Sequence, residues 1–205
     1  MRTIVSFAVL ALMSAPGQTP ARGAEADPLL RDIEGKWKGQ VVRDQADPKR
    51  PVIQIVFHCT SHVPDDVIEQ LVAYPQLRTL GLVGGQHLTN KGLEHISKLT
   101  NLETLEVRNE KLTADGLKHL TKLPKLKSLF LWDVKLNKEN GAALEGLKSL
   151  EVLELREVAV STEAMASLKK LPRLMKIEVF RCDGAFESED VVRKEFPDVK
   201  VNLSM

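Results

Sequence analysis

Apolar residues recur along this chain in a unit of about 24 residues, the step from Leu102 to Leu126. In the unit that begins at Leu102, apolar side chains also stand at Leu105 and Val107, with polar residues around them. Alternation of this kind predicts a short strand with one buried face. The same pattern starts again at Val52, Leu77, Leu126, Leu150, Leu174 and, in a degenerate terminal copy, Val199.

The second half of each unit has the spacing of a short helix. Leu117, Leu120 and Leu123 stand three residues apart and follow Thr113, a residue type that caps helix N-termini. A proline two residues before the next strand pattern ends the helix and extends the residue before it. These prolines are Pro75, Pro124, Pro172 and Pro197.

One strand and one helix bury too little apolar surface to fold alone, so the units must stack on one another. Stacking places the strands in a parallel sheet and the helices in a row that packs against it. The sequence therefore predicts an α/β solenoid over residues 52–205.

The strand pattern Leu-x-x-Leu-x-Leu, followed by Leu-Thr-x-x-Gly-Leu-x-x-Leu, resembles leucine-rich repeats. The helical half is similar to the cysteine-containing repeats of F-box-associated proteins and to repeats of exported bacterial leucine-rich repeat proteins. The resemblance implies a curved sheet on the concave side, short helices on the convex side, and partner binding on the concave face. Gly141 and Met165 depart from the pattern, because a leucine is expected there, and the spacing is loose over residues 182–192.

Residues 1–26 have the layout of a secretory signal peptide. Arg2 precedes an apolar run from Ile4 to Met13, and small residues follow, with candidate cleavage sites after Ala24 and Ala26. The run is shorter than the ~20 residues that span a bilayer. We expect an exported protein, periplasmic or extracellular, without a membrane span after cleavage; an uncleaved N-terminal anchor is the alternative.

Residues 27–51 are expected to form an N-terminal cap. Leu29, Leu30, Ile33 and Trp37 have helical spacing, and the Val41–Val42 pair predicts a short strand. Such a cap covers the open end of the core and the edge of the first repeat strand.

The composition excludes some classes of function. The chain has 29 Lys and Arg against 28 Asp and Glu, a net charge of +1, so nothing favours nucleic acid as the obligate partner. Aromatic residues make up 4%, and the sequence has no nucleophile elbow, Walker loop or dinucleotide fingerprint. We therefore expect a protein that is not an enzyme and that needs no cofactor.

A cluster of histidine and cysteine residues suggests one alternative function. His58, Cys59 and His62 could serve a metal-dependent enzyme or a metal-binding protein, although a structural zinc site needs four ligands. His95 and His119 hold the same place in two successive helices, which indicates repeat consensus rather than a catalytic pair.

The residues predicted to bind a partner are those that alternate away from the core on the concave face. Trp, Phe and Arg are enriched in binding hot spots, and here they stand on a sheet face where we expect them to be exposed. The predicted protein- or peptide-binding surface is centred on Phe130 and Trp132. It also contains Arg108, Arg156, Phe180, Glu106, Glu154 and Glu178.

Two alternatives to this surface remain. The aromatic rings could simply pack on each other while the Glu and Arg ladders keep the sheet soluble. The resemblance to F-box-associated repeats also suggests an adaptor subunit of a larger complex, although the export signal argues against an intracellular role.

Overall fold

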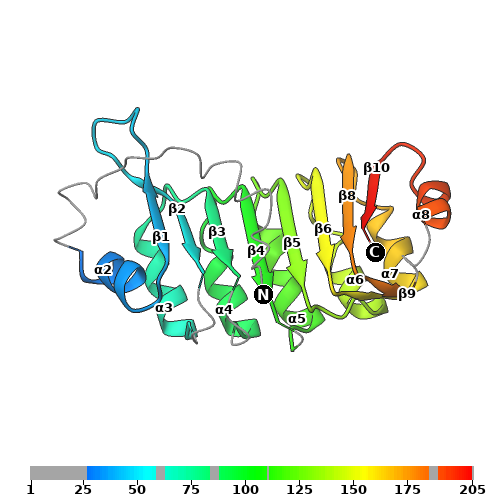
Figure 1. The fold of residues 1–205 in the computed structure, drawn as a ribbon, viewed down its shortest axis with the longest axis horizontal. Helices are drawn as coiled ribbons and strands as arrows, with labels where there is room; N and C mark the ends of the chain where they lie inside the picture. The colour runs from blue at the N-terminus through cyan, green and yellow to red at the C-terminus, as the bar shows by residue number, and fades with distance from the viewer. Residues whose placement is uncertain (1–26, 59–62, 84–87, 110, 185–188, 205) are drawn as a thin grey trace.

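The repeated strands lie side by side in one sheet that runs the length of the molecule (Figure 1). The computed structural model describes residues 27–58, 63–83, 88–109, 111–184 and 189–204. Within these residues the sheet has eight strands, and every neighbouring pair is parallel except the first. In order, they are β1 (Gln40–Arg43), β2 (Val52–Phe57), β3 (Thr79–Leu82), β4 (Thr104–Arg108), β5 (Ser128–Trp132), β6 (Val152–Arg156), β8 (Lys176–Phe180) and β10 (Lys200–Ser204).

Short helices lie in a row along the sheet, with α2 beyond one end and α8 at the other (Figure 1). They are α2 (Pro28–Gly35), α3 (Asp65–Gln70), α4 (Asn90–Ile96), α5 (Ala114–Leu117), α6 (Lys138–Leu144), α7 (Thr162–Leu168) and α8 (Glu189–Glu195), with 3-10 turns η2 (Leu71–Ala73) and η3 (Lys118–Lys122). Side chains of Thr89, Asn137 and Ser161 cap α4, α6 and α7. Thr113 precedes α5 but does not cap it, because it is bonded to Asn90 of the preceding helix.

The core is a set of leucine columns that cross the strands. Leu105, Leu129 and Leu153 are direct neighbours in the register of β4, β5 and β6, and each is fully buried. Helix residues such as Leu117 and Leu144 belong to the same core cluster. The predicted α/β leucine-rich repeat solenoid is therefore confirmed, with one strand and one helix in each central unit.

A second, two-stranded sheet joins the loops that follow the strands near the C-terminal end. It pairs β7 (Ala159–Val160) with β9 (Asp183–Gly184), and Leu136 bridges to Val160. This sheet aligns the strand-exit loops of successive repeats.

The segment that follows the N-terminal helix packs against the first repeat strand. Trp37 is 5% exposed, and its ring meets Phe57 edge-on, with ring centroids 6.3 Å apart. Asp27 caps α2 and also accepts a 2.7 Å hydrogen bond from the Tyr74 hydroxyl. Burial and this carboxylate together raise the pKa of Tyr74 above its usual range.

Candidate functional site

Two rows of side chains cross the sheet on its helix-free face, the face opposite the core, on which no described helix packs. The inner row runs through Glu106, Phe130, Glu154 and Glu178, in register on β4, β5, β6 and β8. The outer row, two residues further along each strand, consists of Arg108, Trp132, Arg156 and Phe180. The structure thus brings together all eight residues of the predicted binding surface, which we call the sheet patch.

Arg156 lies at the centre of the outer row. Its guanidinium is 4.7 Å from the ring centroid of Trp132 and 4.2 Å from that of Phe180. The guanidinium also forms an ion pair with Glu154 on the same strand. The Arg108 guanidinium lies 5.7 Å from the centroid of the Trp132 ring. Cation–π contacts therefore link four side chains of the outer row into one stack.

The prediction that Phe130 is exposed is wrong. In the full chain, Phe130 is 1% exposed, although it lies outside the core cluster that the strands share with the helices. Its register neighbours are the long side chains of Glu106 and Glu154, and strands only ~4.8 Å apart leave little room around the ring. Arg156 is buried as well, and Trp132 and Phe180 are half-buried.

The sequence analysis did not predict a row of charged residues that directly follow the strands and have a left-handed backbone conformation. Asp133, Glu157 and Arg181 have φ of 55°, 54° and 49° and each directly follows a strand. Arg108 Nε lies 2.6 Å from Asp133 Oδ2, and Arg108 Nη2 lies 3.5 Å from Glu157 Oε2. The signal was present in the sequence, because these three positions are one repeat apart.

Glu106 differs from the other carboxylates of this face. It is fully buried, and neither carboxyl oxygen has a hydrogen-bond partner. Burial and the nearby Glu154 carboxylate raise the pKa of Glu106 to about 7, and Arg156 and the Trp132 indole offset this in part. The buried indole Nε1 lies near enough to this carboxylate to lower its pKa, although the two groups do not form a hydrogen bond of normal geometry.

The fold class is established by the parallel strand register and the leucine core described above. Among solved structures, the chain is similar to a crystal structure of PEPR1–AtPEP1, with 16% identity, a TM-score of 0.42, and coverage of 67% of this chain and 19% of that chain. It is also similar to an internalin (inlF) from Listeria monocytogenes str. 4b F2365, with 16% identity, a TM-score of 0.43, and coverage of 67% and 44%. The chain thus spans less than half the length of either. No protein-family model matches the chain, and no curated protein does.

The histidine and cysteine candidates fall partly outside the described residues. Of the predicted metal alternative, His58 is half-buried, and burial lowers its pKa, whereas Cys59 and His62 are not described. Among the described side chains, no group of three or more His, Cys, Asp or Glu could hold a metal ion. His95 is buried in α4, with Nδ1 3.9 Å from Glu69 Oε1 of the preceding helix.

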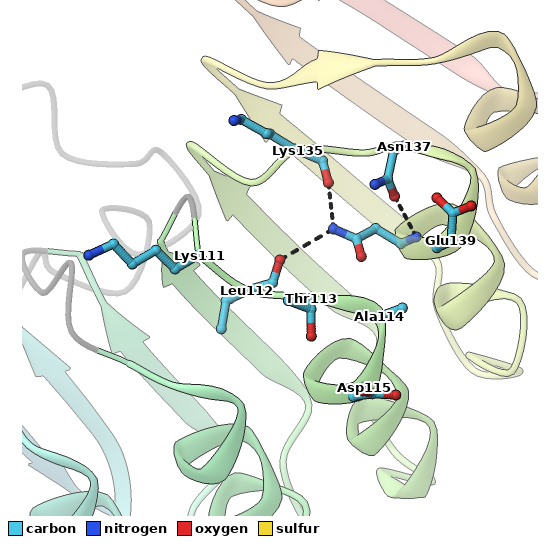
Figure 2. Close-up of a pocket in the computed structure, with 9 residues that line it drawn as sticks. Lys111, Leu112, Thr113, Ala114, Asp115, Lys135, Asn137 and Glu139 are labelled. Atoms are coloured by element: carbon cyan, nitrogen blue, oxygen red, sulfur yellow. Dashed lines mark hydrogen bonds between the residues drawn. The ribbon is translucent and has the colours of Figure 1, made fainter.

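A pocket of about 420 Å³ lies between the loops that lead into α5 and α6 (Figure 2). The buried amide of Asn140 sits in its wall and donates hydrogen bonds of 3.3 and 2.7 Å to the carbonyls of Leu112 and Lys135. Because both amide hydrogens are bonded to backbone carbonyls, one of them in the preceding repeat, Asn140 joins two repeats.

The N-terminal segment 1–26, predicted to be a signal peptide, lies outside the described residues. In the described part of the chain, no helix combines the length and the apolar character needed to cross a lipid bilayer.

Proposed function

We propose that this protein is a non-catalytic binding or scaffold module that recognises a protein or peptide on the helix-free face of its solenoid. The observation that carries the proposal is the outer row of the sheet patch, where Trp132 and Phe180 flank Arg156. Half-buried aromatic rings stacked on arginine present a broad, rigid contact area, which is the composition of protein-binding hot spots.

The geometry of the sheet patch supports the binding of a partner more than it supports catalysis. Arg108 and Arg156 are held in place by carboxylates, so their side chains are ordered before a partner arrives. Pre-ordering lowers the entropy that a partner must overcome.

The test is site-specific photo-crosslinking in extracts of the extracytoplasmic fraction of the source organism. A photoreactive phenylalanine analogue replaces Phe180 in one protein and Lys118, which is exposed on η3, in the matched control. We expect a specific adduct from position 180 and none from position 118. Adducts of equal yield from both positions would contradict binding on the helix-free face.

The first quantitative prediction concerns the affinity for the partner identified by crosslinking. Trp132→Ala should weaken binding by about 2 kcal/mol or more, because truncating a central tryptophan removes a hot spot. Calorimetric titration measures the affinity, and thermal unfolding checks the fold. A loss of stability like that of Leu129→Ala, with unchanged affinity, would show instead that the ring is structural.

Export of the protein is a further part of the proposal. It rests on the layout of residues 1–26, with Arg2 before an apolar run and small residues at the candidate cleavage sites. N-terminal sequencing of the protein isolated from its natural source should begin at Glu25 or Asp27. A chain that still begins at Met1 would favour the uncleaved anchor.

A further inference from the structure

The parallel topology places the two kinds of turn on opposite rims of the solenoid. From β2 to β10 the strands of the main sheet run the same way, so every turn from a helix into a strand lies on one rim (Figure 1). Backbone hydrogen bonds join these turns in successive repeats, from Lys127 N to the Glu103 carbonyl at 2.9 Å and from Glu151 N to the Lys127 carbonyl at 2.8 Å. Charged residues of these turns therefore gather along one edge of the molecule.

This helix-to-strand rim is rich in positive charge. Four lysines and no carboxylate lie between Asp115 and Asp133, on η3 and the turn after it. Three lysines and one arginine, again without a carboxylate, lie between Glu163 and Glu178. The net charge of +1 for the whole chain hides this arrangement, because only the parallel fold brings these cations to one side.

The carboxylates of the three central turns of this rim are already paired. Their ion pairs are Glu103 with Lys127 at 2.9 Å, Glu145 with Lys170 at 2.8 Å and Glu151 with Arg173 at 3.5 Å. In the described part of the chain, this leaves Lys122, Lys125 and Lys148 without a carboxylate partner. We call these three exposed lysines, which lie in adjacent repeats, the basic rim.

The ammonium groups of the basic rim contact an imidazole ring, an amide oxygen and a backbone carbonyl. The contacts are Lys122 Nζ with His119 Nδ1 at 3.4 Å, Lys125 Nζ with Asn101 Oδ1 at 2.7 Å and Lys148 Nζ with the Glu145 carbonyl at 3.4 Å. An ammonium group has three hydrogens to donate, so each lysine can also meet an external anion.

We propose that the basic rim attaches the protein, edge-on, to a phospholipid bilayer with anionic headgroups. Lysine is a compact, strongly hydrated point charge that suits diffuse attraction to a charged surface, whereas the planar fork of arginine suits recognition of single carboxylates. The large apolar side chains that are exposed in the described residues are Val72, Met175 and Val191, and none of them lies in the turns that carry the basic rim. The attachment is therefore electrostatic and involves no insertion into the bilayer.

This attachment goes beyond the proposed function and is compatible with it. Lys125 precedes β5, and Trp132 is the last residue of that strand, so the outer row of the sheet patch lies toward the opposite rim. A protein held by the basic rim would keep Trp132 and Phe180 away from the lipid and open to a partner.

The experiment measures co-sedimentation of the purified protein with vesicles of phosphatidylcholine, either alone or mixed with phosphatidylglycerol. We expect binding to the mixed vesicles only, and its loss on addition of salt. Lys122→Gln, Lys125→Gln and Lys148→Gln combined should weaken this binding roughly a hundredfold, about fivefold for each lysine. Arginine at the same three positions should preserve it, because a diffuse attraction needs only the charge.

The matched control removes the same charge from the opposite rim, through Lys111→Gln, Lys135→Gln and Lys138→Gln combined. These lysines are exposed and follow β4 and β5. The control should change binding by less than about threefold, since a strand of ~17 Å separates the rims and the Debye length is ~10 Å. All variants have the same N-terminus, so any contribution from residues 1–26 cancels, and thermal unfolding checks each fold.

Three results would overturn the proposal. One is equal binding to the neutral and the mixed vesicles, and another is an equal loss of binding in the two glutamine variants. The third is retention of the protein on immobilised polyglutamate without binding to mixed vesicles, which would assign the basic rim to an acidic polypeptide instead.

Discussion

Gly92 and Gly116 stand at the same position of their helices, where the preceding helix approaches. A Cβ atom at Gly116 would lie 2.1 Å from Oδ1 of Asn90 and 3.0 Å from its Cα, and one at Gly92 would lie 2.4 Å from Oδ1 of Asp65. Asn90 and Asp65 are themselves engaged, because they bond to Thr113 and Thr89. The glycine of the repeat pattern is thus explained by the close contact between neighbouring repeats.

Gly116→Ala should therefore destabilise the protein by about 1–3 kcal/mol, because the added methyl group forces Asn90 away from Thr113. Gly35→Ala is the matched control, since a Cβ there meets no atom within 4 Å. In a helix, that second substitution should be neutral or stabilise by up to about 1 kcal/mol. Urea unfolding of both variants compares the two. Equal effects would refute the steric explanation.

Glu106 leads to a prediction about stability and pH. Its pKa is raised from 4.5 to about 7 in the folded chain, so the folded state binds more protons than the unfolded state between these values. Stability should therefore fall as the pH rises from about 4.5 to about 7, and the charged group should cost up to about 3 kcal/mol above that range.

Glu106→Gln removes this titration. The variant should gain stability relative to the unmodified protein at alkaline pH, and the gain should shrink toward acidic pH. Unfolding curves measured on both sides of pH 7 test this. A difference between the two proteins that is independent of pH would show that Glu106 ionises as freely in the folded chain as in the unfolded one.

At the scale of elements, strand register decides which residues share a core column. The parallel pairing of β4, β5 and β6 aligns Leu105, Leu129 and Leu153 without a shift. Each of these side chains is 0% exposed, so the column has no solvent-facing member. A cavity at Leu129, the centre of this column, would therefore remove packing contacts from both neighbouring repeats.

Leu129→Ala should cost about 2–5 kcal/mol, from lost burial and the cavity left behind. The control is Met175→Ala, at a position before β8 that is 58% exposed and should change stability by less than about 0.5 kcal/mol. Thermal and urea unfolding give both values. A Leu129→Ala protein that melts near the unmodified one would contradict the register.

At the scale of the whole molecule, the linear order of strands keeps the two cysteines apart. Cys182 lies just after β8 and is half-buried, and its Sγ is 3.5 Å from the carbonyl oxygens of Leu155 and Phe180. Cys59 is outside the described residues, but it follows His58 at the end of β2 in the sequence. Five strand steps separate β2 from β8, roughly 24 Å at ~4.8 Å each.

A disulfide needs Cα atoms within ~7 Å, so we expect no bond between Cys59 and Cys182 within one chain. Thiol titration of the freshly purified, denatured and unreduced monomer should find both cysteines free. An intramolecular bond between them would be incompatible with the linear stack of repeats.

The sequence by itself determined the repeat, the strand register and the identity of the residues on the helix-free face. Each follows from local periodicity, which is written into the chain as the spacing of residues such as Leu105 and Leu129. The burial of Phe130 and the unpartnered state of Glu106 were decided only by the tertiary structure. Both depend on side chains that reach across from neighbouring strands, and the ion pairs of Arg108 with Asp133 and Glu157 depend on left-handed strand exits. Periodicity determines which face of the sheet a side chain is on, but it does not determine which side chain of a neighbouring strand fills the space beside it.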